Sequence, residues 1–594
     1  MKMVLRYLKP YLPRMSLGLA IKFIGSVMDL LLPWMLSKII DDVVPQKDLR
    51  LILLWGGGMV LAAALAWVTN ILANRMAAWV AQHTTQSIRH DLFVKISQLS
   101  CSQVDDYSIP SLEARLTTDT YNVHQMIGMA QRIGVRAPIL LVGGILVTLT
   151  LDPVLTLVLV CTLPFLAGIV AGVSRKGIPM YRVLQQKVDA MIRVVRENIS
   201  GIRVIKALSK TEYEKERFAG VNKEVSDQER KAGLVMGLTN PFVNLFMNAG
   251  LTAVVLVGAF RVNNGQTQPG TILAFLSYFS IILMSMMAIT RVFVMASRGA
   301  ASAGRIDQVL QTPEDLTLED RPAEQTSYHV EFREVSFSYG KKENNLEGIS
   351  FALKPGETLG VIGATGSGKS TLIHLLQRLY DPDRGCVLLN GRDVRSIPPE
   401  ELHTKFGVVY QNDVIFADTL YENIDFGRHL PREEVEKAAR AAQAMEFISQ
   451  LEDGFDHQLT ARGTNLSGGQ KQRVLVARAL AGAPEILILD DSSSALDYRT
   501  DAALRRALRE DYGGVTSVII AQRVSSLQHA DHILVLEEGR AIGCGTHEEL
   551  LETCPVYAEI ARIQMERVTV SPEKEERRGL RGQTNAAAYG KEGV

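Results

Sequence analysis

Six apolar segments in the first half of the chain constrain its fold more than any other feature. Lipid offers backbone groups no hydrogen-bond partners, so apolar segments that cross a bilayer form helices. Each of these segments is close to the length of about 20 residues that a bilayer-spanning helix needs. Buried helices of a large soluble protein are the alternative, but six such runs in one half argue against them. We therefore predict an all-α transmembrane domain over residues 1–305, embedded in the lipid bilayer. The segments run approximately over Leu17–Ile40, Leu51–Val80, Ile127–Leu149, Val154–Val173, Leu234–Phe260 and Thr271–Met295.

The connections between these segments alternate between short and long, and the long ones are charged. The long connections are about His83–Met126 and Arg175–Ala232, and they hold many lysine and arginine residues. Basic residues concentrate on the cytoplasmic side of a membrane protein. We therefore expect a multi-pass protein of the cell (plasma) membrane whose N-terminus, long loops and C-terminus are cytoplasmic.

Several polar residues fall at membrane depth, where they are costly and usually face a cavity or a partner helix. Two interpretations stay open for them, namely interhelical hydrogen bonding and the lining of a translocation cavity. No cluster of charges in this half points to one substrate chemistry. The residues in question are Asp29, Asn70, Asn74, Arg75, Asn240, Asn244 and Asn248.

The second half contains a run that fits the phosphate-loop pattern G-x-x-x-x-G-K-[ST]. It follows the strand-like stretch Leu359–Ile362 and precedes the helix-like stretch Thr371–Tyr380. Glycines let backbone N–H groups surround a phosphate at the helix N-terminus, while the lysine reaches the β- and γ-phosphates and the serine binds Mg²⁺. A glycine-rich turn without a nucleotide is disfavoured by this context. The predicted nucleotide-binding residues are Gly363, Thr365, Gly366, Ser367, Gly368, Lys369, Ser370 and Thr371.

Composition shifts divide the rest of the chain. Residues 306–328 are polar and acidic and hold two prolines, so we predict a linker there. Residues 329–566 are predicted to form a cytosolic α/β phosphate-loop domain, and residues 567–594 a disordered tail. The formal net charge is zero, which gives no bulk support for nucleic-acid binding, and we expect no nucleic-acid partner.

Two further motifs follow the phosphate loop. Leu466-Ser-Gly-Gly-Gln470 opens a predicted helix, and the strand-like run Ile486–Leu489 ends in Asp490 and Asp491. An acid at the end of such a strand lies beside the phosphate loop, where Asp490 can hold Mg²⁺.

Together with Gln411 and Ser494-Ala-Leu-Asp497, these motifs resemble the nucleotide-binding domain of ABC transporters. With six spans in front, residues 1 to about 565 resemble a half-transporter of the bacterial multidrug exporter class. The resemblance implies ATP and Mg²⁺ as cofactors and a second ABC half-transporter as partner. It also implies roles for particular residues at the nucleotide: Tyr339 would stack on adenine, and Gln411 would sense the γ-phosphate and the metal. Two nucleotide sites would be linked by Asp497, and ATP of the opposite subunit would be contacted by Ser467, Gly469 and Gln470. The coupling helices would be Ser108–Glu113 and Ser209–Glu214.

Two departures from the family pattern fall in one catalytic site. Asp491 stands where efficient members have Glu, and Gln522 stands where they have a γ-phosphate histidine. The loop Thr460–Gly463 also lacks a glutamate commonly found there. We expect a degenerate-site subunit of a heterodimeric exporter of small lipophilic molecules, whose signature completes the partner's site. A homodimeric exporter with slow turnover and an ATP-gated channel or sensor remain as alternatives.

Overall fold

The computed structural model describes residues 1–341, 344–492 and 494–569, which divide into two compact units. The helical unit contains Met1–Gln98 and Ser108–Thr312. The sheet unit contains Leu99–Tyr107 and the described residues from Pro313 onward. This arrangement of membrane-type helices followed by an α/β domain confirms the predicted fold class.

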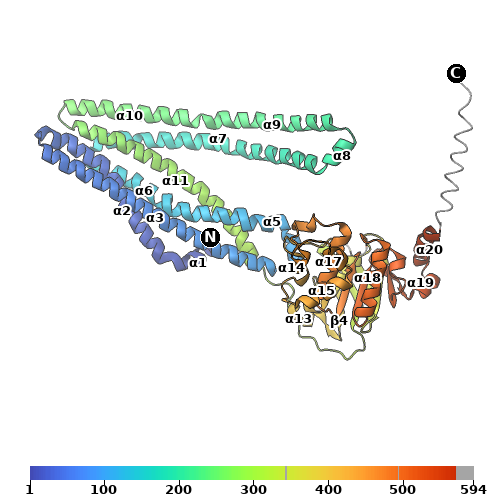
Figure 1. Ribbon diagram of the computed structural model, residues 1–594. Helices are drawn as coiled ribbons and strands as arrows, with labels where there is room; N and C mark the ends of the chain where they lie inside the picture. The colour runs from blue at the N-terminus through green and yellow to red at the C-terminus, as the bar shows by residue number, and fades with distance from the viewer. Residues whose placement is uncertain (342–343, 493, 570–594) are drawn as a thin grey trace, which may run out of the picture. The chain divides into compact units, whose positions relative to one another are not determined.

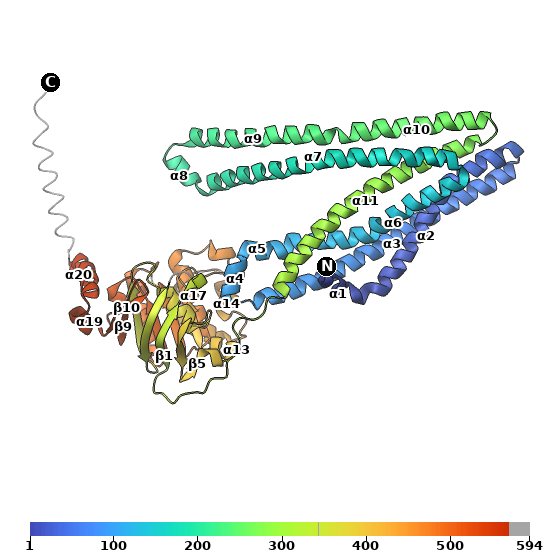
Figure 2. The same cartoon turned by 180° about the vertical axis from the view of Figure 1, so that it is seen from behind.

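The helical unit is a bundle of long helices, seen from two sides in Figures 1 and 2. Helices α7 and α9–α10 run side by side in both views, and the short α8 joins α7 to α9. The elements are α1 (Lys2–Leu8), α2 (Leu12–Lys38), α3 (Leu49–Ser97), α5 (Ile109–Ala114), α6 (Thr120–Leu151), α7 (Pro153–Ser200), α8 (Ile202–Ala207), α9 (Thr211–Gly237), α10 (Thr239–Asn263) and α11 (Pro269–Leu310).

Six helical stretches of this unit are long and apolar enough to cross a membrane. All six predicted spans fall within them, so the prediction from apolar length is confirmed. The fifth span covers the junction of α9 and α10, and several of these helices are much longer than a bilayer requires.

The junction of α6 and α7 shows how one polar residue sets such a hairpin. Asp152 lies between the helices in an extended conformation, and its Oδ1 accepts hydrogen bonds from the backbone N–H groups of Val154 and Leu155. This caps α7 at its N-terminus, where an anionic side chain is favourable. Its Oδ2 accepts from Nε of Arg261 on α10 at 3.0 Å, so the same carboxylate also ties α10 to the hairpin.

The polar residues predicted at membrane depth differ in what they contact. Asp29 accepts a hydrogen bond from Arg136 at 2.8 Å, which joins α2 to α6. Asn74 accepts from Lys22 at 3.0 Å, which joins α3 to α2. The three asparagines of α10, at positions 240, 244 and 248, are exposed in the unit.

The sheet unit contains two sheets. The smaller is antiparallel with strand order β2-β1-β4-β5, and the larger has the order β10-β9-β3-β8-β7-β6. The larger sheet is parallel except for the β10–β9 pair. The strands are β1 (Val330–Phe337), β2 (Leu346–Leu353), β3 (Thr358–Gly363), β4 (Arg384–Leu389), β5 (Arg392–Asp393), β6 (Phe406–Val409), β7 (Ile486–Asp490), β8 (Thr516–Ile520), β9 (His532–Glu537) and β10 (Arg540–Gly545).

The parallel strands position the site, because their carboxyl ends meet at one edge of the sheet. Strand β7 is buried along its whole length, which explains its unbroken apolar run. The loops after β3, β7 and β8 begin at this edge, with β8 between the other two strands. The helices of the unit are α4 (Cys101–Tyr107), α12 (Lys369–Leu376), α13 (Pro399–Thr404), α14 (Leu420–Asp425), α15 (Arg432–Ala441), α16 (Met445–Ile448), α17 (Gly468–Ala481), α18 (Tyr498–Asp511), α19 (His547–Thr553) and α20 (Pro555–Thr569). Residues 570–594 of the predicted tail lie outside the described residues.

Helix α4 is an early segment of the chain that packs within the sheet unit. Asp105 accepts a hydrogen bond from the Tyr380 hydroxyl at 2.6 Å, and Gln103 donates to the Pro313 carbonyl at 2.7 Å. The predicted coupling segment Ser108–Glu113 lies just after α4 and belongs to the helical unit, as does Ser209–Glu214. The role of these two segments as coupling helices stays a prediction.

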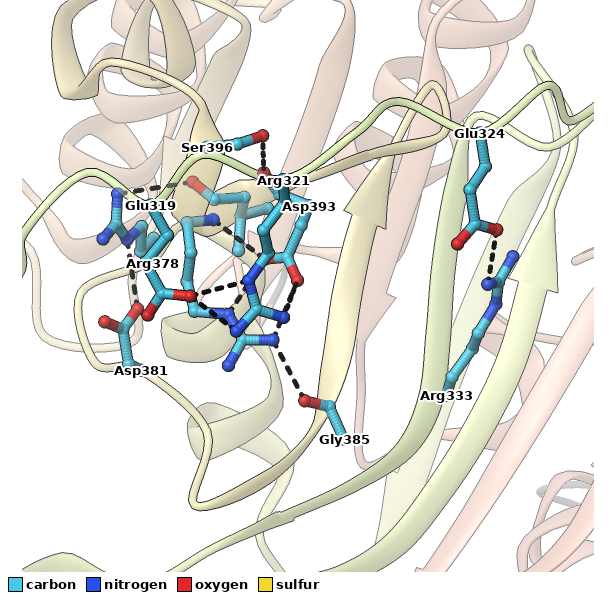
Figure 3. Close-up of polar contacts among 11 residues, drawn as sticks. Glu319, Arg321, Glu324, Arg333, Arg378, Asp381, Gly385, Asp393 and Ser396 are labelled. Atoms are coloured by element: carbon cyan, nitrogen blue, oxygen red, sulfur yellow. Dashed lines mark hydrogen bonds and ion pairs between the residues drawn. The ribbon is translucent and has the colours of Figure 1, made fainter.

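The stretch before β1 is held to the sheet unit by ion pairs (Figure 3). Arg321 contacts Glu319 and donates to Asp393 at 2.9 Å. Arg378, whose side chain is 2% exposed, donates to the Thr317 carbonyl at 2.6 Å. The later part of the segment predicted as a linker is thus attached to the folded unit by specific contacts.

Candidate nucleotide-binding site

The phosphate loop joins β3 to α12 and requires glycine at defined positions. Gly366 and Gly368 have φ values of +84° and +99°, a region that favours glycine. At Gly363 an added Cβ would lie 2.2 Å from the carbonyl oxygen of Leu536. The sequence motif therefore reflects both backbone conformation and close approach of a neighbouring strand.

Two side chains of the loop have donors suited to a phosphate. Lys369 Nζ donates to the carbonyls of Gly363 and Ala364 at 3.0 and 2.7 Å, and burial lowers the pKa of this lysine. The hydroxyl of Ser367 is buried and has no hydrogen-bond partner among the described residues. A buried donor without a partner is costly, so an anionic ligand at the loop would satisfy it. These features fit the phosphates of a nucleotide.

Ser370 and Asp490 form the candidate Mg²⁺ site. The Ser370 hydroxyl donates to Asp490 Oδ2 at 3.1 Å, and burial raises the pKa of Asp490. No group of three His, Cys, Asp or Glu side chains suited to a metal occurs in the described ranges. Mg²⁺ needs few protein ligands, since it is commonly bound by one or two oxygens together with substrate phosphates. The donor set therefore fits Mg²⁺ bound with a nucleotide.

The two departures from the family pattern lie side by side. Nε2 of Gln522, after β8, donates to Oδ2 of Asp491, after β7, at 3.3 Å. The backbone N–H of Asp491 donates to the Ile520 carbonyl at 3.0 Å, and its φ is +50°. Burial raises the pKa of Asp491, while the charges of Arg523 and Lys369 oppose this rise. Both side chains line a small cleft of about 120 Å³.

Tyr339 follows β1 and contacts residues that the sequence did not single out. Its hydroxyl lies 3.1 Å from Nδ1 of His374 on α12, and its ring meets that of Tyr380 edge to face at 5.2 Å. The ring is partly exposed. Stacking of Tyr339 on adenine stays a prediction. Neither His374, inside α12, nor Tyr380, beyond its end, belongs to a sequence motif, so these contacts of Tyr339 left no signal in the sequence.

The signature residues form a second group at the start of α17. Ser467 caps this helix, accepting from the Gln470 N–H at 3.3 Å, while the Gln470 side chain accepts from the Ser467 N–H at 2.8 Å. This reciprocal pair is a capping box. Asp497 caps α18, and hydrogen bonds from Thr500 lower the pKa of its carboxyl. Gly469 leaves room for the Ala495 carbonyl, 3.2 Å from where a Cβ would lie.

The structure brings some predicted residues together and leaves others apart. The phosphate loop, Asp490, Asp491 and Gln522 gather at the carboxyl edge of the larger sheet. In the parts of the chain that are described, no hydrogen bond joins Ser467 or Gly469 to the phosphate loop. Gln411, after β6, is exposed at the same edge of the sheet.

Family models match both halves of the chain. The model of the ABC transporter transmembrane region matches residues 15–286, and the ABC transporter model matches residues 346–494. The second match includes the phosphate loop, the signature, Asp490 at the end of β7 and Asp491 after it.

Known proteins agree with this assignment over nearly the whole chain. The ABC transporter ATP-binding protein YfiB of Bacillus subtilis is 36% identical over 96% of this chain and 99% of its own. An ABC transporter ATP-binding protein of Mycobacterium tuberculosis strain H37Rv is 33% identical over 95% and 98%. The structure of a bacterial Atm1-family ABC exporter with ATP bound shares the fold, with a TM-score of 0.77, 24% identity and coverage of 94% of this chain and 99% of that one. This chain therefore belongs to the ABC transporter family, with a transmembrane region and an ATP-binding domain that couples ATP to transport across a membrane.

Proposed function

We propose that this chain is the degenerate-site half of a heterodimeric ABC exporter in the plasma membrane, with its termini in the cytoplasm. The observation that carries this proposal is the contact between Gln522 and Asp491 at 3.3 Å. Two departures that act on the same attacking water occur in one site, whereas the phosphate loop and the signature are intact.

The chemistry of this site explains why its turnover would be slow. A general base must reach the water that attacks the γ-phosphate. The carboxylate of Asp491 is one methylene shorter than that of a glutamate, so it reaches less far towards that water. The amide of Gln522 donates a hydrogen bond to this carboxylate but cannot become a cation or carry a proton. Ser370 and Asp490, with Gln411 as a further expected ligand, would hold Mg²⁺, which would neutralise charge on the phosphates.

The intact signature supports a role in the opposite site. Ser467 is exposed at the start of α17, so it is available to a second nucleotide-binding domain. Its partner would be a half-transporter with an intact catalytic glutamate, and Asp497 would link the two sites. ATP binding would then close the two domains, and hydrolysis at the partner's site would reset the transporter.

The test compares two substitutions in the assembled pair. Ser467→Arg should nearly stop ATP hydrolysis, because it blocks the competent site. Asp491→Asn should have a mild effect, because its own site contributes little turnover. Lys369→Ala serves as the control that abolishes nucleotide binding at this chain's site. Equal losses from Ser467→Arg and Asp491→Asn would instead indicate a homodimer with equivalent sites.

The two alternatives predict different measurements. A homodimeric exporter would pump in sealed vesicles without any second chain, at a slow rate. A chain that turns over ATP without a partner at tens per second, as efficient enzymes do, would rule out the degenerate assignment. An ATP-gated channel or sensor would let solute flow down its gradient without concentrating it.

A further inference from the structure

The helical unit contains a cavity of about 680 Å³ between α2, α3, α6 and α11. Its volume lies in the range that organic ligands occupy. Four basic side chains line it although they are far apart in the sequence, namely Lys22, Arg132, Arg136 and Arg291. This convergence was not visible in the sequence, where the membrane half showed no cluster of charges.

Most of this positive charge has no counter-ion. Asp29 pairs with Arg136 at 2.8 Å. Lys22 donates to the amide oxygen of Asn74 at 3.0 Å, and Arg132 donates to the Gly128 carbonyl at 3.1 Å. Among the described side chains, no carboxylate lies within 4.0 Å of Lys22, Arg132 or Arg291. Three cations of the cavity therefore have no ion-pair partner within 4.0 Å among the described side chains.

These charges lie within the predicted spans. All four residues fall within the apolar stretches predicted to cross the membrane. Charge at that depth is costly and is associated with substrate or ion pathways. Lysines near span ends commonly extend to the headgroups, but Lys22 is 3% exposed and is enclosed by neighbouring helices. Nε of Arg136 is also buried without a hydrogen-bond partner among the described residues.

Most of the other lining residues are apolar, although Asn74, Ser280 and Ser285 also line the cavity. Met129, Ile133 and Leu140 of α6 line it, together with Met284 of α11. Methionine side chains adapt to ligands of different shape. The wall thus offers cationic donors to one end of a ligand and a deformable apolar surface to its body.

We propose that this cavity binds an amphiphilic organic anion, with its acidic head on Lys22, Arg132 and Arg291 and its apolar body on the methionine-bearing wall. This inference rests on the proposed export function and narrows its substrate class from lipophilic molecules in general to anions. An acidic lipid of the surrounding bilayer and a free amphiphilic acid share this chemistry.

The test measures binding to the assembled transporter in nanodiscs of phosphatidylcholine. Two tritiated probes are used: taurocholate, which is an amphiphilic sulfonate, and tetraphenylphosphonium, which is a lipophilic cation. Their binding is measured by a scintillation proximity assay. Taurocholate should bind saturably, and Arg132→Gln with Arg291→Gln should raise its Kd by about tenfold or more, about 1.4 kcal/mol. Tetraphenylphosphonium should bind the wild type more weakly than taurocholate does.

Two control variants separate charge from folding. Arg75→Gln removes a basic residue of α3 that does not line the cavity, and taurocholate affinity should not change. Arg132→Lys with Arg291→Lys keeps both charges, so it should retain most of the affinity. Equal taurocholate affinity in the wild type and the double glutamine variant would overturn the proposal, as would a preference for the cation.

A second arm identifies the source of the anion. Native mass spectrometry follows the transporter after exchange into phosphatidylglycerol and phosphatidylcholine with the same acyl chains. Selective retention of phosphatidylglycerol by the wild type, lost in the double glutamine variant, assigns the cavity to acidic lipid. Binding of taurocholate without such retention assigns it to free amphiphilic acids. If the transporter exports a cationic dye with ATP but binds no anion, this inference is refuted and the proposed function stands. If it binds the anion but moves no solute with ATP, the export function is refuted.

Discussion

Restoring the two missing groups should speed hydrolysis at this chain's own site. The perturbation is Asp491→Glu combined with Gln522→His, in a pair whose partner has its catalytic glutamate disabled. The remaining ATPase activity then comes from the site built on this chain's phosphate loop. We expect a rise of at least about tenfold, or 1.4 kcal/mol of barrier.

The magnitude follows from reach and backbone conformation. Glutamate is longer by one methylene, about 1.5 Å, and misplacement by roughly 1 Å can cost on the order of 10²-fold in rate. Against this gain, residue 491 has a φ of +50°, in the left-handed region that aspartate tolerates and that costs other side chains about 1 kcal/mol. If the strained backbone relaxes to an unproductive conformer that is favoured by this amount, the productive conformer is depleted accordingly. The about 2.7 kcal/mol of a hundredfold gain then falls to about 1.7 kcal/mol, or roughly fifteen- to twentyfold.

Steady-state phosphate release provides the assay. Asp491→Asn with Gln522→His is the matched control, since it restores the imidazole without a carboxylate and should show no gain. The partner's signature must be intact, because it completes this site. With an intact partner signature, an unchanged rate in the restored variant would refute the reasoning and shift attention to the loop Thr460–Gly463.

Three further predictions concern folding and nucleotide binding. Gly363→Ala should weaken ATP binding by at least about tenfold in a fluorescent-nucleotide titration, because its Cβ would meet a backbone oxygen at 2.2 Å, whereas Gly514→Ala, with nothing within 4 Å, should bind normally. Arg378→Ala should destabilise the sheet unit by about 2–4 kcal/mol in thermal unfolding, since it leaves buried partners unpaired, whereas the exposed Arg540→Ala should cost less than about 1 kcal/mol. Burial lowers the pKa of His329, so the unfolded chain binds a proton on this residue more strongly than the folded chain does. The free energy of unfolding therefore decreases as the pH falls below the ordinary histidine pKa of about 6.5. His329→Asn should therefore flatten the decline of the melting temperature on acidification.

Local patterns were sufficient to predict much of the fold and to indicate where the candidate nucleotide site lies. The spans follow from apolar length alone, and the loop Gly363–Ser370 follows from a motif whose residues are adjacent in the sequence. The strand ending in Asp490 was predictable because a strand buried on both faces is apolar throughout. Each of these features depends on neighbours within a few residues.

Other features depend on residues that meet only in the folded chain. The charges of the cavity come from α2, α6 and α11, so no window of sequence contains them together. The ion pair between Arg321 and Asp393 attaches a polar stretch that resembles an ordinary linker. The left-handed backbone at Asp491 also leaves no sequence signal, since aspartate is common in many conformations.

The docking of α4 has a consequence for the order in which the protein is made. Tyr380 is 275 positions after Asp105, so the ribosome completes α4 long before its binding surface exists. A helix of seven residues is unstable by itself in water. The segment 99–107 would stay unfolded during synthesis of the remaining spans, and the maturing sheet unit would then capture it. A fragment beginning at Pro313 would lack one piece of its own compact unit, and an added peptide of residues 99–107 would be its natural complement.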